Sequence, residues 1–196
     1  MRAYNLTLLL ILFILVRSDA QEVLRNYVVL YKGEDIGIIK LKQTTRGDSV
    51  LYKMTSDIKT RFIFKITVKS EEESTFHGGK LLYSAVNRTV NGDEKVKRQT
   101  IAGNNVYTLN KEGKPGIIYS EIINYNLMSL YCKEPVNIAS VYSDNHQQFL
   151  PIRKINDHTY KIDLPDGNYN HYIYNNGICV KVDVFSTLFN MELVLR

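Results

Sequence analysis

The chain has 196 residues, of which 25 are lysine or arginine and 20 are aspartate or glutamate, so its formal net charge is +5. This mild basic excess, with acidic residues interspersed along the chain, argues against a nucleic-acid partner. The 4 histidines and 2 cysteines lack the C-x-x-C or H-x-x-x-H spacing of a metal site, which argues against a bound zinc ion.

Residues 1–20 have the pattern of a secretory signal peptide. A positive charge precedes a nearly unbroken apolar run from Leu6 to Val16, and a small-x-small cleavage site ends at Ala20. The run is too short to cross a bilayer, since a spanning helix needs about 20 apolar residues. We therefore expect an exported protein, periplasmic or extracellular, with a single β-rich domain over residues 21–196 and no transmembrane segment in the mature chain.

Between Asn26 and Val96, alternating apolar and polar residues are interrupted by turns that contain Gly or Asn. These turns are typical of β-hairpins, because Gly and Asn tolerate the positive φ that short connections require. The pattern predicts a mainly antiparallel sheet. The strands predicted in this half are Tyr27–Tyr31, Ile36–Leu41, Val50–Met54, Arg61–Val68 and Leu81–Val90.

One segment departs from the strand pattern and predicts a single helix of about 10 to 12 residues. Ser120 is a suitable N-cap, apolar residues recur at roughly helical spacing as far as Tyr131, and Pro135 prevents continuation. Strands resume after this segment and again alternate with turns rich in Asn, Asp and Gly. They are predicted at Asn137–Tyr142, Gln147–Ile155, Thr159–Leu164, Tyr169–Tyr174, Ile178–Phe185 and Phe189–Leu195.

About ten to twelve strands exceed what a flat sheet holds, because accumulated twist makes a large antiparallel sheet curl or split. We therefore predict a mostly β fold, in which a large curved antiparallel sheet (a half-barrel or barrel-like) has one short α-helix packed against its concave face. A closed barrel or a two-sheet sandwich is the alternative. The residues expected to line a cavity between helix and sheet are Phe62, Phe64, Ile66, Ile123 and Leu127.

Cys132 and Cys179 are the only cysteines in the chain. In an exported protein they are free to form a disulfide. Two buried thiols that pack as small apolar residues fit the sequence equally well, since the separation of the two Cα atoms cannot be deduced from it.

Several short motifs resemble those of a known group of proteins. They are Tyr27-Val28-Val29-Leu30-Tyr31-Lys32-Gly33-Glu34-Asp35-Ile36-Gly37, the segment Met128–Tyr131, the turn Leu164–Asn168 and the ending Tyr172–Cys179. They are similar to those of uncharacterised secreted proteins of Bacteroidota and, more distantly, of a periplasmic β-rich domain family of unknown function. The resemblance implies a curved β architecture with one helix, similar to periplasmic lipoprotein carriers, and it supplies no catalytic residues. Gly33 and Gly37 in these motifs are expected to flank a turn where a Cβ would be strained.

No catalytic signature is present, because the chain lacks a Gly-x-Ser-x-Gly motif and a phosphate-binding loop. We therefore predict a protein of the cell envelope that is not an enzyme, needs no cofactor, and binds a lipid or another apolar or amphipathic small molecule in its curved sheet. The alternative is a structural or interaction module that contacts another envelope protein. An enzyme whose His146 or His171 meets distant carboxylates is a third hypothesis.

The 14 tyrosines fit either a binding surface or ordinary strand positions.

Overall fold

The computed structural model describes residues 20–61, 65–119, 122–187 and 189–196, with only the backbone described at Arg61 and Lys65. Residues 1–19 of the predicted signal peptide lie outside these ranges. The same holds for two residues predicted to line a cavity, Phe62 and Phe64, and for the start of the predicted helix, Ser120 and Glu121.

The described residues form one large antiparallel sheet of 14 strands, which confirms the predicted mostly β class. The first arm of the sheet contains β1 (Gln21–Tyr31), β2 (Glu34–Arg46), β3 (Ser49–Arg61), β4 (Lys65–His77), β5 (Lys80–Val90), β6 (Asp93–Ala102), β7 (Tyr107–Lys111) and β8 (Lys114–Ile118). The second arm contains β9 (Ser140–Ser143), β10 (Gln148–Asn156), β11 (Thr159–Asp163), β12 (Tyr169–Asn175), β13 (Ile178–Phe185) and β14 (Asn190–Leu195).

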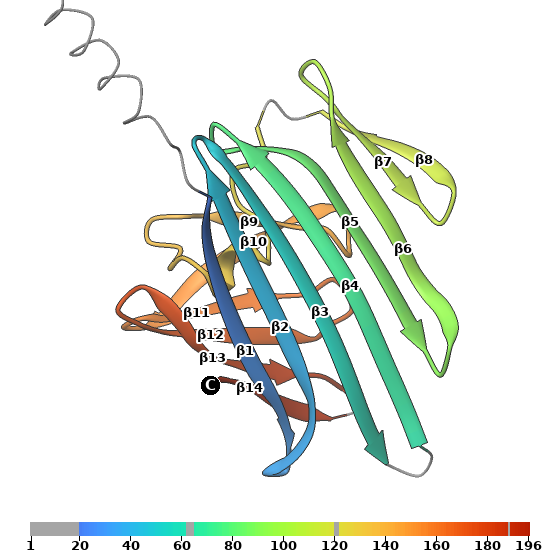
Figure 1. Ribbon diagram of the computed structural model, residues 1–196, viewed down its shortest axis with the longest axis vertical. Helices are drawn as coiled ribbons and strands as arrows, with labels where there is room; N and C mark the ends of the chain where they lie inside the picture. The colour runs from blue at the N-terminus through green and yellow to red at the C-terminus, as the bar shows by residue number, and fades with distance from the viewer. Residues whose placement is uncertain (1–19, 62–64, 120–121, 188) are drawn as a thin grey trace, which may run out of the picture.

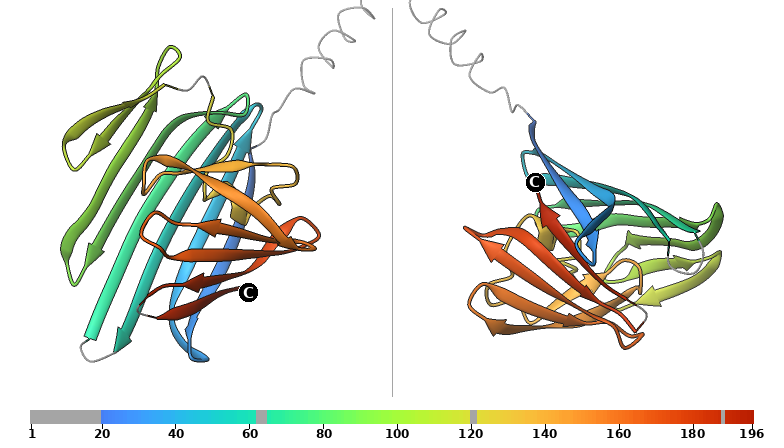
Figure 2. Two further views of the ribbon diagram at one scale, coloured as in Figure 1. Left: turned by 180° about the vertical axis from the view of Figure 1, so that it is seen from behind. Right: turned by 90° about the horizontal axis from the view of Figure 1, so that it is seen from below.

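Each arm is a meander in which consecutive strands are neighbours, and the two arms join where β1 pairs with β14. Figure 1 shows the long strands of the first arm running across one side of the molecule and the second arm lying behind them. The views in Figure 2 show that the arms converge at β1 and β14 and face each other. In the described part of the chain the edge strands β8 and β9 do not pair, so the sheet is folded over but not closed.

The predicted α-helix is wrong. The described residues contain no α-helix, and the only helical turn among them is the short 3₁₀ segment η1 (Ser129–Tyr131). Before it the backbone is extended, because the Tyr142 N–H donates to the Tyr125 carbonyl at 2.8 Å and the Leu127 N–H donates to the Tyr142 carbonyl at 3.1 Å. These bonds to β9 replace the i to i−4 bonds of a helix. Tertiary pairing thus overrides the helical pattern of this segment, whose Ile, Asn and Tyr residues have only weak helix propensity.

Several strand boundaries also differ from those predicted. β3 continues beyond Met54 to Arg61, and the predicted single strand Arg61–Val68 is wrong, because Arg61 ends β3 and is paired with Lys65 at the start of β4. The strands β6, β7 and β8 were not predicted. These strands are largely polar, and their pairing with β5 and with one another defines them more than any alternation of apolar residues does.

Two-residue hairpin turns are the feature that local sequence predicts best. Asn91-Gly92 has φ values of 54° and 93°, and Asn176-Gly177 has φ values of 50° and 76°. Two consecutive positive φ values are the geometry of a type I′ turn, which matches the twist of the flanking strands. These two dipeptides therefore specify the hairpins β5–β6 and β12–β13.

The core lies between the two arms and includes residues from both of them. Leu41 of the first arm, Ile162 of the second and Leu130 of the segment between β8 and β9 are all fully or almost fully buried in one cluster. The segment of residues 122–139, which we call the plug, thus fills part of the hollow with irregular backbone in place of the predicted helix. A buried irregular segment must satisfy its backbone groups by contacts with its surroundings.

Candidate functional site

Tyrosine hydroxyl groups supply much of this backbone satisfaction. The Tyr107 hydroxyl accepts a hydrogen bond from the Ile123 N–H at 3.0 Å, and the Tyr174 hydroxyl donates to the Leu130 carbonyl at 2.8 Å. One tyrosine comes from each arm, so the plug is tied to both sides of the hollow. These tyrosines therefore act inside the core and not on an exposed binding surface.

A second anchor of the plug is the buried side chain of Asn126. Its Nδ2 donates to Ser74 Oγ at 3.0 Å and to Asp144 Oδ2 at 2.9 Å, while its Oδ1 accepts from the Ser129 N–H at 3.0 Å. Ser74 lies on β4 and Asp144 lies in the turn after β9. One amide therefore connects the plug to the first arm and to the second.

Among the described carboxyl groups, that of Asp144 has the largest shift in pKa. Its side chain is only 4% exposed, and burial raises its pKa to about 7, with a further increase from the charge of Glu72 and opposing effects from the nearby Ser84 hydroxyl and Asn126 amide. Its Oδ1 makes no hydrogen bond in the structure. A neutral carboxyl is therefore favoured at this position up to near-neutral pH.

A cavity of about 500 Å³ lies between the plug and strands β3 and β4; we call it the β3–β4 cavity. Tyr52 and Phe76 form its buried wall and pack edge to face, with ring centroids 6.0 Å apart. Ile122 and Lys133 of the plug are exposed at the cavity surface. The other lining residues are Val50, Gly78, Gly79, Asn124, Tyr125 and Ser129.

A second cavity, of about 340 Å³, lies on another side of the plug; we call it the Asp144 cavity. Leu127 of the plug and Met191 of β14 contribute to its apolar walls, and Arg88 pairs with Glu72 within it at 3.3 Å. Its lining is thus much more charged than that of the β3–β4 cavity.

His146 also lines the Asp144 cavity, and burial lowers its pKa. The fold does bring this histidine near acids distant in sequence, since Glu72 and Asp166 line the same space. The His146 ring Nε2 lies 3.5 Å from the Asn145 amide Nδ2. Among the described residues, His146 makes no hydrogen bond to a carboxylate.

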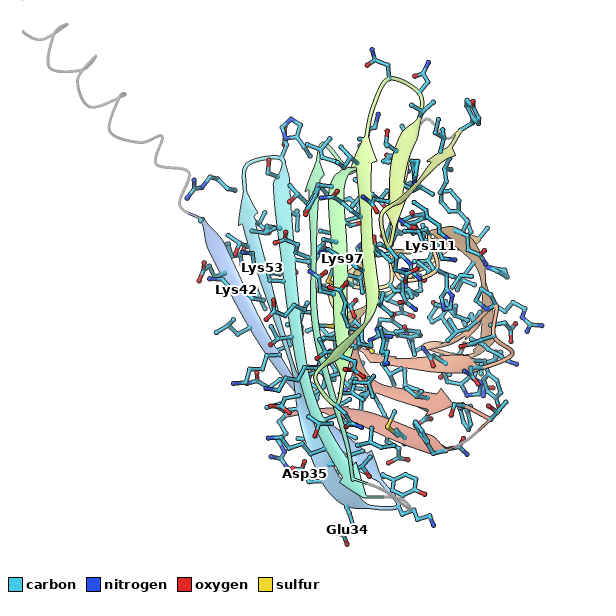
Figure 3. The ribbon with its side chains drawn as sticks, turned by 90° about the vertical axis from the view of Figure 1, so that its right-hand side faces the viewer. Glu34, Asp35, Lys42, Lys53, Lys97 and Lys111 are labelled. Carbon is cyan, nitrogen blue, oxygen red and sulfur yellow. The ribbon has the colours of Figure 1, made fainter. Side chains whose placement is uncertain are left out.

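The outer face of the first arm carries many lysines that are matched by acids. Lys42 lies 2.7 Å from Glu22, and Lys97 lies 3.9 Å from Glu94. Lys42 and Lys53 are cross-strand neighbours on β2 and β3, and Figure 3 shows Lys97 apart from them on β6. This arrangement is typical of a solvated strand face.

The described ranges contain no helix with the length and apolar character needed to cross a membrane. Within the same ranges, no three His, Cys, Asp or Glu side chains are grouped so that they could hold a metal ion.

Comparison with known proteins identifies the family. The profile of a domain of unknown function, DUF6134, matches residues 27–196. The chain belongs to the DUF6134 family. This agrees with the predicted resemblance to a β-rich family of unknown function.

The DUF6134 fold is similar to a solved structure described as a β-barrel-like protein of domain of unknown function DUF1849 from Brucella abortus. The TM-score is 0.54 and the identity 9%, over 92% of this chain and 97% of that chain. At such low identity the likeness concerns the fold alone. No curated protein matches the DUF6134 chain.

The residues predicted to line a cavity in this DUF6134 chain lie in different places. Leu127 does line the Asp144 cavity, Ile123 is completely buried in the core, and Ile66 is half-buried on β4 and lines neither cavity. Phe62 and Phe64 are outside the described residues. Four residues that line the β3–β4 cavity were not predicted to do so: Val50, Tyr52, Phe76 and Lys133. Val50 and Tyr52 alternate within a predicted strand, so the sequence already indicated that they share one face.

Cys132 and Cys179 are unbonded thiols in the structure, one half-exposed and the other buried. Burial raises the pKa of the Cys132 thiol to about 11 and that of Cys179 to about 12. Cys179 belongs to the buried core cluster and Cys132 packs against that cluster. A bridge between them stays a prediction.

Proposed function

We propose that the protein binds an apolar or amphipathic small molecule in the β3–β4 cavity and catalyses no reaction. The observation that supports this proposal is the cavity itself. Its volume of about 500 Å³ falls within the range of roughly 300–1,000 Å³ that is typical of ligand sites. Its lining is largely apolar and aromatic with a few polar groups, which is the usual composition of such sites.

The walls of the cavity are positioned before any ligand arrives. Tyr52 and Phe76 are buried and in contact with each other on adjacent strands. On the opposite side, Tyr125 and Ser129 belong to the plug, which Asn126 and the tyrosine hydroxyls hold in place. A preformed pocket binds with less loss of conformational entropy than one that must be ordered.

Filling the cavity should abolish binding. Val50 is half-buried on the inner face of β3, and we expect Val50→Trp to place an indole ring in the space that the ligand needs. Titration with the apolar fluorescent probe N-phenyl-naphthylamine should show binding weakened at least about tenfold. Native mass spectrometry of the purified protein should show a co-purified small molecule that the variant lacks.

The matched control is Leu51→Trp, at the next position of β3 and on its other face. This variant adds the same side chain outside the cavity and should bind the probe as the natural protein does. Thermal unfolding of both variants checks that each is folded. Equal probe binding by folded Val50→Trp and the natural protein would contradict the proposal.

We further propose that the protein is exported to the periplasm or the extracellular space. The signal-like pattern of residues 1–20 supports this, as does the start of β1 at Gln21, directly after the expected cleavage point. Fractionation of the native host, followed by N-terminal sequencing of the purified protein, should give Gln21 as the first residue in the extracytoplasmic fraction. Recovery of an intact N-terminus from the cytoplasm would refute the proposal.

A role in binding another envelope protein is the second candidate function. The observation in its favour is the exposed apolar surface beside the open β8 edge, where Ile117 is 58% exposed and Tyr119 is 84% exposed. Exposed apolar groups next to an unpaired strand are a common basis for protein contacts. This surface does not line either cavity, so the Val50→Trp variant would leave it unchanged.

A further inference from the structure

The β3–β4 cavity carries a positive charge and no negative one among its described lining residues. Lys133 lies at its exposed surface, with Nζ 5.5 Å from the centroid of the Tyr125 ring. Within the described part of the chain, no carboxylate forms an ion pair with this ammonium group. Its charge is therefore available to a ligand in the cavity.

The acid nearest to Lys133 in sequence is engaged elsewhere. Glu134 Oε1 accepts a hydrogen bond from the Tyr160 hydroxyl at 2.8 Å and lies 3.1 Å from His158 Nδ1. The backbone on both sides is also fixed, because the Lys133 N–H donates to the Ser129 carbonyl at 3.0 Å and the Glu134 N–H donates to the Gly177 carbonyl at 3.1 Å. Glu134 thus stays with the second arm and leaves Lys133 unneutralised.

A second cation, Arg25, lies on the same face of the sheet as the aromatic wall, because Arg25 pairs with Leu41 and Leu41 with Met54, two residues from Tyr52. Arg25 is half-buried on β1, and its Nη1 donates to Cys132 Sγ at 3.4 Å. Burial raises the pKa of Tyr52 to about 12, and the charge of the Arg25 guanidinium opposes this rise. Arg25 makes no ion pair with a described carboxylate either, so both cations contribute a positive potential to this cavity.

The Asp144 cavity differs in sign. Glu72 and Asp166 line it together with Asp144, whose carboxyl is neutral up to near-neutral pH, while Arg88 is its single arginine or lysine among the described residues. An anion would therefore be disfavoured there and favoured in the β3–β4 cavity. The two cavities of the same hollow are distinguished by charge as well as by shape.

We propose that the β3–β4 cavity selects amphiphiles with an anionic headgroup, a carboxylate or a phosphate on an alkyl chain. The chain contacts the wall of Tyr52 and Phe76, and the headgroup binds Lys133, with Arg25 adding to the attraction. This inference rests on the proposed function and names its ligand class. A charge-assisted contact of this kind is roughly twice as strong as a neutral hydrogen bond.

Isothermal titration calorimetry of the purified protein with laurate, dodecyl phosphate and dodecanol, each below its micelle concentration, tests the inference. The apolar chains of the three probes are nearly the same, laurate being shorter by one methylene group, so larger differences in affinity report on the headgroup. We expect at least one of the two anions to bind about tenfold more tightly than dodecanol. Comparison of laurate with dodecyl phosphate shows whether the carboxylate or the phosphate is preferred.

Variants then assign the effect to a residue. Lys133→Gln should weaken binding of the anion much more than binding of dodecanol, and so remove most of the preference, whereas Lys133→Arg should retain the preference. Lys40→Gln is the matched control, because it removes the same charge from the exposed outer face of β2. The melting temperature of each variant shows that it is folded.

Each outcome decides a separate point. Equal binding of all three probes would overturn the inference and leave the proposed function intact, whereas binding of none of them would overturn both. An unchanged preference for the anion in folded Lys133→Gln would also overturn the inference, since the headgroup would then lie elsewhere.

Discussion

Replacing Asp144 by asparagine should stabilise the protein at about pH 8. Burial raises the pKa of this carboxyl in the folded state to about 7, from an ordinary value of 3.8. The folded state therefore binds a proton that the unfolded chain has lost, and stability falls as the pH rises between these two values. Above about pH 7 the whole loss of stability is present, and it is at most about 4 kcal/mol for a pKa shift of about three units.

Asparagine has nearly the same shape and does not ionise, so this loss should disappear. Its Oδ1 can still accept the hydrogen bond that Asn126 donates to Asp144. The free energy of unfolding, measured with urea at about pH 5 and pH 8, should decrease with pH in the natural protein and much less in Asp144→Asn. Asp157→Asn, in an exposed turn, is the control and should keep the natural pH dependence. Parallel pH profiles for Asp144→Asn and the natural protein would refute this account.

Gly37→Ala should destabilise the fold by about 3 kcal/mol, although its φ is not positive. A Cβ built at Gly37 would lie 2.3 Å from the Asp57 carbonyl oxygen and 2.7 Å from the Ile58 Cα. Both are backbone atoms of β3, so β2 and β3 would have to separate. The predicted turn strain thus holds only at Gly33, where φ is +84°, while Gly37 is required by close approach of two strands.

The control is Gly116→Ala on the edge strand β8, where the nearest atom, Leu109 Cβ, would lie 3.5 Å away. We expect this variant to change stability by less than about 1 kcal/mol. Urea unfolding followed by circular dichroism compares the two variants under the same conditions. Similar stability of Gly37→Ala and Gly116→Ala would show that β2 and β3 adjust to the added methyl group.

The elements that were predicted correctly depend on residues close together in the chain. Asn176-Gly177 specifies a hairpin because both residues accept positive φ, whichever strands they join. Likewise Ile39 and Leu41 alternate with lysines, which places them on the buried face of β2. Local chemistry is therefore sufficient for most strands of the meanders and for the antiparallel class of the sheet.

The plug and the cavities depend on contacts between distant residues. Apolar residues up to Leu130 recur at helical spacing, yet bonds to Tyr107 and Tyr142 on opposite arms select an extended backbone. Lys133 likewise becomes a candidate for ligand binding only because the fold engages Glu134 with the second arm. The sequence by itself determined most of the strands, several of their turns and the class of sheet, since these follow from dihedral preference and alternation. Only the tertiary structure decided the plug and the charge of each cavity, because these arise where the two arms of the sheet come together.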